Sequence, residues 1–202
     1  LFYNRIPKAA NSTVVGVLAA HSDYARSFHA GAKAKSRFLR PSRMGAAMVA
    51  AMDSDWLKFT LVRHPMTRAL SAYLDKIAGR KAQSVPFFRW FGGGEPTFTD
   101  FCRYLDAGGL WHDMHWAPQS GILLLPLERF DMIGRFERIE PDLEAIIQRG
   151  FGAGTELRMR RAGPKPTGAD DSKDRHLTDE ARDILARLYV EDFRAFGYDP
   201  GA

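Results

Sequence analysis

Ile6-Pro7-Lys8-Ala9-Ala10-Asn11-Ser12-Thr13 is the stretch that decides how this chain of 202 residues folds. It follows the apolar run Leu1-Phe2-Tyr3 and precedes Val14-Val15-Gly16-Val17-Leu18, so the order predicts a strand, a loop and a helix. A helix start presents backbone N–H groups and the positive end of the helix dipole. A lysine and two hydroxyl residues at such a turn therefore predict a phosphate-binding loop. The two glycines of the nucleotide P-loop are absent.

A second strand–helix junction lies at Arg63-His64-Pro65. The preceding run, Trp56 to Val62, is nearly continuous in apolar residues, which is typical of a parallel strand covered on both faces. Pro65 fits the first turn of a helix. Arg63 can hold a phosphate with two N–H donors, and Ser71, two turns into the helix, can add a hydroxyl. Ligands of parallel sheets bind at the carboxyl ends of the strands, where both junctions lie.

Further strands are predicted at 122–125 and 132–136, with a short one near 37–39. Helices are predicted at 44–52 and 99–105, from Pro141, and after Thr178, which can cap the last helix. Residues 80–96 and 157–173 are predicted to be long loops. Strands that alternate with helices indicate an α/β fold with a mainly parallel central sheet flanked by helices. The length suits one domain, residues 1–202.

The formal net charge of +5 favours anionic partners. Cys102 is the only cysteine, which excludes an intrachain disulfide and a cysteine metal cluster. The longest apolar run, Ile122 to Leu127, is too short to span a bilayer, so no membrane span is expected in this chain. The sequence does not begin with Met, so a leader or anchor upstream could have been removed.

The stretch Pro7 to Thr13 resembles the 5′-phosphosulfate loop of sulfotransferases, which use 3′-phosphoadenosine-5′-phosphosulfate (PAPS). Arg63, Pro65, Arg68 and Ser71 resemble the 3′-phosphate motif of the same family, in which His64 replaces an acidic or amide residue. Three other segments resemble the carbohydrate sulfotransferase branch: His115 to Gln119, Ile133 to Glu137 and Tyr189 to Tyr198.

The resemblance implies transfer of a sulfuryl group from PAPS to a hydroxyl or amine, with a saccharide or polysaccharide as the expected acceptor. Lys8 would stabilise the charge that grows on the leaving phosphate oxygen, and no metal would be needed. A late basic loop with Arg161 would close over the nucleotide, although that loop is also consistent with a solvated linker. The implied PAPS-binding residues are Pro7, Lys8, Ala9, Ala10, Asn11, Ser12, Thr13, Arg63, Ser71 and Arg161.

A hydroxyl acceptor needs a general base, for which histidine is the commonest choice. His115 is the first candidate because it lies in the family-like segment, and its neighbours His112 and Asp113 are alternatives. His115 could instead be a structural histidine beside Trp116.

Two other functions remain open. A P-loop-like small-molecule kinase would need Mg²⁺ and an acidic ligand near a strand end. A non-enzymatic polyanion-binding domain would use the basic surface alone. No nucleic-acid-binding motif is present, so no nucleic-acid partner is expected. A bacterial-type cytoplasmic location is expected, with a lumenal or anchored one if an upstream segment was removed.

Overall fold

The computed structural model describes residues 1–22, 38–39, 41–159 and 167–201. The chain divides into two compact units. We call residues 1–5, 10–61 and 124–165 the sheet unit, and residues 6–9, 62–123 and 166–202 the helical unit. The prediction of one domain over residues 1–202 stays a prediction.

The sheet has three short strands, β1 (Phe2–Asn4), β2 (Lys58–Val62) and β3 (Met132–Arg135), in the order β1-β2-β3. β1 and β2 are parallel and place Tyr3 opposite Phe59, whose rings stack with centroids 5.0 Å apart. All five residues of β2 are buried, as expected for a strand covered on both faces. The predicted α/β fold with a mainly parallel sheet is confirmed.

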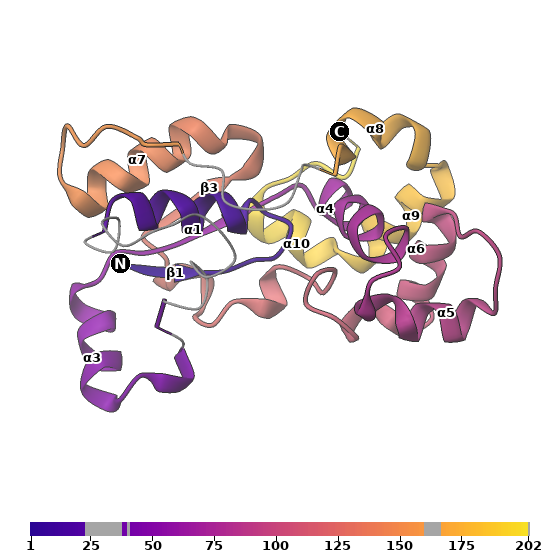
Figure 1. The fold of residues 1–202 in the computed structure, drawn as a ribbon, viewed down its shortest axis with the longest axis horizontal. Helices are drawn as coiled ribbons and strands as arrows, with labels where there is room; N and C mark the ends of the chain where they lie inside the picture. The colour runs from indigo at the N-terminus through magenta and orange to yellow at the C-terminus, as the bar shows by residue number, and fades with distance from the viewer. Residues whose placement is uncertain (23–37, 40, 160–166, 202) are drawn as a thin grey trace. The chain divides into compact units, whose positions relative to one another are not determined.

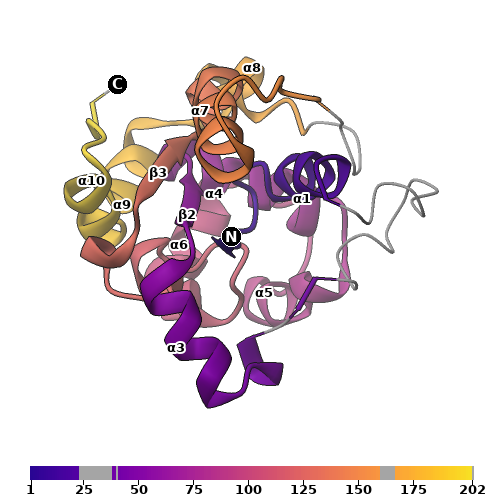
Figure 2. The same cartoon turned by 90° about the vertical axis from the view of Figure 1, so that its left-hand side faces the viewer.

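Two helices pack on the sheet, α1 (Asn11–Ala20) and α7 (Ile139–Phe151) (Figure 1). Their contacts with β2 form a small apolar core that contains Val14, Val17, Leu18, Phe59, Leu61, Leu143, Ile146 and Ile147. A third helix, α3 (Ala46–Asp55), leads into β2 and buries only Met52 (Figure 2). Short 3-10 turns lie at Pro41–Arg43, Leu127–Arg129 and Phe136–Arg138.

The helical unit begins with α4 (Pro65–Ala72), which continues into one π-helical turn, Tyr73–Ile77. Phe101 is fully buried in the core of the helical unit, where its ring contacts those of Tyr73, Phe87 and Trp116. The other helices are α5 (Val85–Phe91), α6 (Phe98–Asp106), α8 (Ala169–His176), α9 (Asp179–Leu188) and α10 (Val190–Phe196). Shorter 3-10 turns lie at Ala82–Ser84, Gly109–Trp111 and Ser120–Ile122.

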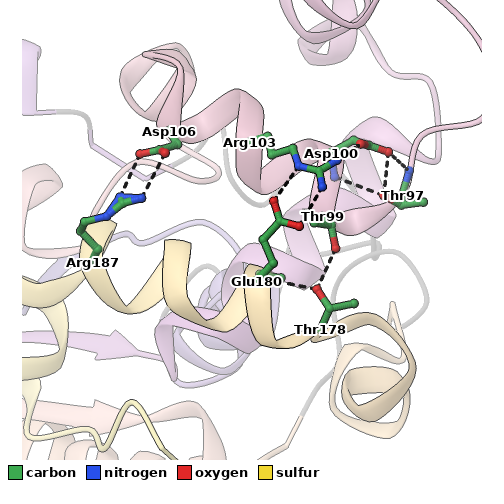
Figure 3. Close-up of polar contacts among 9 residues, drawn as sticks. Thr97, Thr99, Asp100, Arg103, Asp106, Thr178, Glu180 and Arg187 are labelled. Carbon is green, nitrogen blue, oxygen red and sulfur yellow. Dashed lines mark hydrogen bonds and ion pairs between the residues drawn. The ribbon is translucent and has the colours of Figure 1, made fainter.

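Polar contacts join α6 to α9 at the surface of the helical unit (Figure 3). Arg103 donates two hydrogen bonds of 2.7 Å to Glu180, and Arg187 donates two of 3.1 Å to Asp106. Thr178 caps α9, as predicted. Because exposed ion pairs contribute little to stability, the aromatic core holds these helices together.

The structure corrects several predictions about local structure. The predicted loop 80–96 contains α5, whose Phe87 is fully buried in the aromatic core. The predicted strand 122–125 is absent because a 3-10 turn ends at Ile122 and irregular chain follows. The predicted loop 157–173 contains the start of α8, which follows Gly168 with a φ of +68°.

The ends of two predicted helices also differ. From sequence alone, the first helix is expected to start near Asn11 or Ser12, since both are good N-cap residues. In the structure Ala10, just before them, occupies the N-cap position of α1. The predicted last helix is two helices, α9 and α10, that meet at Tyr189. Arg37 of the short strand predicted near 37–39 lies outside the described residues, and Phe38 and Leu39 are not in a strand.

Candidate active site

The first half of the predicted phosphate loop, Pro7 to Ala9, belongs to the helical unit. Lys8 has a φ of +67°, a left-handed conformation that costs a non-glycine residue free energy. The Lys8 carbonyl accepts a hydrogen bond of 3.3 Å from Nη1 of Arg63, and the Pro7 carbonyl accepts one of 2.9 Å from Nε of Arg68. The two predicted anion-binding motifs therefore meet, and arginines of the second support the backbone of the first.

Arg68 is 1% exposed and is held by three backbone carbonyls. Besides Pro7, it donates to the carbonyl of Ala117 at 2.8 Å and to that of Met114 at 3.0 Å. These contacts use the forked geometry of the guanidinium, which a lysine cannot reproduce. Arg68 thus fixes the phosphate loop to the His115 segment instead of facing the expected phosphate.

The ammonium of Lys8 lies 3.0 Å from Oδ2 of Asp75, in the π-helical turn after α4. Lys76 lies 3.2 Å from the same oxygen, and Lys81 bonds the other oxygen. Burial lowers the pKa of Lys8, and the charges of Lys76 and Lys81 lower it too, while Asp75 raises it. Burial alone would raise the pKa of Asp75, but hydrogen bonds from Lys81 and Lys8 outweigh it and hold that pKa far below its usual range.

Arg63 and Ser71, the predicted 3′-phosphate ligands, contact the same late segment of the chain. Nη2 of Arg63 donates to Oδ2 of Asp170 at 2.7 Å, and Oγ of Ser71 lies 2.9 Å from Oγ1 of Thr167. The Arg63 side chain is only 4% exposed, whereas that of Asp170 is 52% exposed. An acidic and a hydroxyl side chain therefore contact the two groups that were predicted to bind a phosphate.

The backbone of Arg63 is clamped by Gln119, which accepts from the Arg63 N–H at 3.0 Å and donates to its carbonyl at 2.8 Å. Asp192 is fully buried and accepts hydrogen bonds from the backbone N–H groups of Gln119 and Ser120 at 2.7 and 2.8 Å. The family-like segments near Gln119 and Asp192 thus position Arg63.

His64, which departs from the family motif, makes contacts that support the fold. Its Nε2 lies 3.0 Å from the carbonyl oxygen of Asp199, and its ring meets those of Phe193 and Tyr198 edge-on. The substitution is therefore accommodated by the C-terminal segment of the helical unit.

His115 is held by Asp113, which accepts from its backbone N–H at 2.8 Å and lies 2.5 Å from its Nδ1. A carboxylate can only accept, so we assign the proton of neutral His115 to Nδ1, which makes Nε2 the proton acceptor. Burial lowers the pKa of His115, the charges of Lys76 and Lys8 lower it further, and Asp113 raises it. A pKa below the ordinary histidine value of 6.5 favours the neutral imidazole at pH 7.

The alternative bases have other partners. Asp113 orients His115, and His112 places its Nδ1 2.6 Å from the hydroxyl of Tyr104. This arrangement favours His115 as the base and Asp113 as its support.

The second half of the phosphate loop, from Ala10 onward, belongs to the sheet unit. Ala10 has a φ of +55° and directs the chain into α1, whose first turn contains Asn11, Ser12 and Thr13. Oδ1 of Asn11 accepts a hydrogen bond of 3.1 Å from Arg5. The prediction of an anion-binding loop rests on the general property that a helix start presents backbone N–H groups, and it stays a prediction.

Two further predictions concern Arg161 and metals. Arg161 lies outside the described residues. Within the described ranges, no three His, Cys, Asp or Glu side chains gather in a way that could hold a metal ion.

The sequence reasoning missed Asp75, Thr167 and Asp170. Asp75 could have been found, because it lies four residues after Ser71 on the same helix and is followed by lysines at 76 and 81. No local pattern indicates the contacts of Thr167 and Asp170, which are about a hundred residues from their partners in the sequence. Together, the ammonium of Lys8 and the oriented imidazole of His115 suit transfer of an anionic group to a hydroxyl.

Residues 1–199 match the profile of a family described as the Sulfotransferase family. The chain belongs to this family. The match covers both halves of the phosphate loop, the Arg63 junction and the His115 segment. Family membership implies PAPS as the general co-substrate.

Curated relatives point to one branch of the sulfotransferase family. Carbohydrate sulfotransferase 14 of Danio rerio is 31% identical over 163 residues, which is 71% of this chain and 44% of the relative. The human protein of the same name is 29% identical and covers 71% and 42%. Human carbohydrate sulfotransferase 9 is 27% identical and covers 68% and 32%. The chain thus spans less than half the length of these relatives, and no solved structure matches it.

The expectation of a bacterial-type cytoplasmic location is wrong. The relatives named above are carbohydrate sulfotransferases of animals, not of bacteria. In the part of the chain that the structure describes, no helix is both long and apolar enough to cross a membrane.

We predict that Arg68→Lys destabilises the protein although it keeps the charge. A lysine cannot reach all three carbonyls, and each buried carbonyl left without a donor costs about 1–3 kcal/mol. Chemical denaturation should therefore show a loss of at least about 2 kcal/mol in the free energy of unfolding. An unchanged denaturation midpoint would show that Arg68 does not tie these segments together. Arg103→Lys, at an exposed ion pair, is the control and should change the midpoint little.

Proposed function

We propose that this chain transfers a sulfuryl group from PAPS to a hydroxyl, or an amine, of a saccharide acceptor. The observation that supports this most strongly is the contact between the two motifs, in which Arg63 donates to the carbonyl of Lys8. One motif would hold the phosphosulfate and the other the 3′-phosphate. The two charged groups of PAPS would then be bound by neighbouring motifs.

Residues Pro7 to Thr13 would bind the 5′-phosphosulfate through backbone N–H groups and the hydroxyls of Ser12 and Thr13. Lys8 would stabilise the negative charge that develops on the phosphate oxygen as its bond to sulfur breaks. By analogy with phosphoryl transfer, positioning and electrostatic stabilisation would supply most of the catalysis. Arg63, Ser71 and Arg161 would bind the 3′-phosphate side of the nucleotide.

His115 would act on the acceptor. Its Nε2 takes the proton of the acceptor hydroxyl as the oxygen forms a bond to sulfur, and adenosine 3′,5′-bisphosphate leaves with the electron pair of the broken bond. Asp113 would hold the imidazole in the required orientation and stabilise the imidazolium that forms.

A saccharide is the acceptor class that fits best. The named relatives are carbohydrate sulfotransferases. The chain segment that carries His115 exposes Trp111 and Met114, which are 61% and 58% exposed. Exposed aromatic faces of this kind can pack against the apolar faces of sugar rings. The family match gives no support to the kinase or to the non-enzymatic alternative.

The first of three predictions from the proposed function concerns nucleotide specificity. Calorimetry without divalent metal should show much tighter binding of adenosine 3′,5′-bisphosphate than of 5′-AMP, because Arg63 and Ser71 act on the 3′-phosphate. Since Asp170 contacts Arg63, Asp170→Asn should increase the affinity for the bisphosphate but not for 5′-AMP.

The control is Asp171→Asn, which removes the neighbouring charge of α8 without touching the Arg63 contact. Equal affinities of the wild type for the two nucleotides would contradict the assignment of Arg63 and Ser71. An equal gain in both Asp variants would show that only the general charge of α8 matters.

The second prediction concerns Lys8. Lys8→Ala should lower kcat by about a hundredfold or more, the cost of deleting one strong electrostatic donor, and should weaken PAPS binding far less. Single-turnover kinetics with labelled PAPS can separate the two effects. Lys173→Ala in α8 is the control and should keep its kcat; near-normal turnover of Lys8→Ala would refute the catalytic role.

The third prediction concerns His115. His115→Ala should keep nucleotide binding and lose about a hundredfold or more in rate. In the wild type the rate should fall at acidic pH, because the base must be neutral to accept a proton. The midpoint of this fall should lie below the ordinary histidine pKa of 6.5, because burial lowers the pKa of His115. His112→Ala should retain both the rate and this acidic limb. A variant His115→Ala that keeps its rate but melts earlier would make His115 structural.

A further inference from the structure

We propose that Asp75 is a positioning residue, whose carboxylate aims the Lys8 ammonium at the reacting phosphosulfate and keeps it charged there. This role rests on the proposed function and assigns a task to a residue outside both anion-binding motifs. It follows from the 3.0 Å contact between Nζ of Lys8 and Oδ2 of Asp75.

The backbone around Asp75 is specialised. α4 ends at Ala72 and continues as a π-helical turn, Tyr73–Ile77, that contains Asp75. Such turns are rare in proteins, but those that occur are frequently found at functional sites. Ser71 lies one turn earlier on the same helix. The helix that begins at the 3′-phosphate motif therefore also carries the partner of Lys8.

The burial and charge of this cluster explain why a carboxylate is needed. The side chains of Lys8, Asp75 and Lys76 are 13%, 15% and 12% exposed. Lys8, Lys76 and Lys81 all contact Asp75, so three ammonium groups share one carboxylate. Without Asp75, Lys8 would be a partly buried cation beside two others, a situation that favours loss of its proton.

Two other groups near Lys8 supply no negative charge. Arg63 donates to the Lys8 carbonyl, and burial lowers the pKa of His115 below its ordinary value. Asp75 is therefore the single acidic side chain in contact with Lys8 among the residues that the structure describes. An ammonium has three N–H donors, so one can remain on Asp75 while others bind an oxygen of the donor.

The test uses Asp75→Asn, which keeps the shape and removes the charge. Lysines are reductively methylated with a carbon-13 label, the Lys8 signal is identified by its absence in Lys8→Arg, and its pKa is measured by NMR titration. Removing an opposite charge at this distance should lower the Lys8 pKa by about 1–3 units. Because Lys8 must be protonated to act, the alkaline limb of kcat should move to lower pH by a similar amount, while KM for PAPS changes little.

Two further variants sharpen the result. Asp75→Glu should restore both the Lys8 titration and the alkaline limb in large part. Asp106→Asn removes an acid of α6 that is paired with Arg187 of α9, and it should move neither. An unchanged Lys8 titration and pH profile in Asp75→Asn, with only a lower melting temperature, would overturn the positioning role.

The NMR titration does not depend on turnover, so the two proposals can fail separately. A wild type that transfers no sulfate to any saccharide would refute the proposed function. An unshifted Lys8 signal would refute the role of Asp75.

Discussion

The helical unit depends on one constraint, which is that a buried guanidinium must have acceptors for its donors. Arg68 meets it with three backbone carbonyls, those of Pro7, Met114 and Ala117. These carbonyls come from the phosphate loop and from the His115 segment, which are more than a hundred residues apart in the sequence. One buried charge thus brings the proposed donor-binding loop and the proposed base together, and a change there would affect both.

A second pattern concerns the side chains proposed to bind the donor. Lys8 contacts Asp75, Arg63 contacts Asp170, and Ser71 contacts Thr167. Asp75 and Asp170 offer anionic oxygens, as a phosphate or sulfate would, and Thr167 offers a hydroxyl oxygen. Strong anion binders in a partly buried site need such partners, since an uncompensated buried charge is costly. The contact of Lys8 differs from that of Arg63 because Asp75 is itself largely buried, whereas Asp170 is half exposed and so is the easier partner to displace.

The sequence predicted those parts of the fold that a short pattern encodes. Three such patterns each predicted an element correctly: the nearly continuous apolar run of β2, the proline at the start of α4 and the cap at Thr178. The sequence did not predict the elements whose formation depends on tertiary contacts. α5 is a short helix fixed by the burial of Phe87, and α8 has a charged sequence without an apolar period. For the candidate site, Lys8, Arg63 and His115 came from motifs, but Asp75 and Asp170 appear only when the chain is folded. The expected location was wrong because it came from the absence of a visible signal, which is weak information.

Transfer of radiolabelled sulfate from PAPS to a panel of desulfated polysaccharides, in the presence of a metal chelator, tests the proposed reaction most directly. We expect label on at least one saccharide, with release of an equal amount of adenosine 3′,5′-bisphosphate. Retained polysaccharide binding without any transfer would contradict the reaction and favour a polyanion-binding domain. Transfer of phosphate from ATP that requires Mg²⁺, with no transfer from PAPS, would contradict it in favour of a kinase.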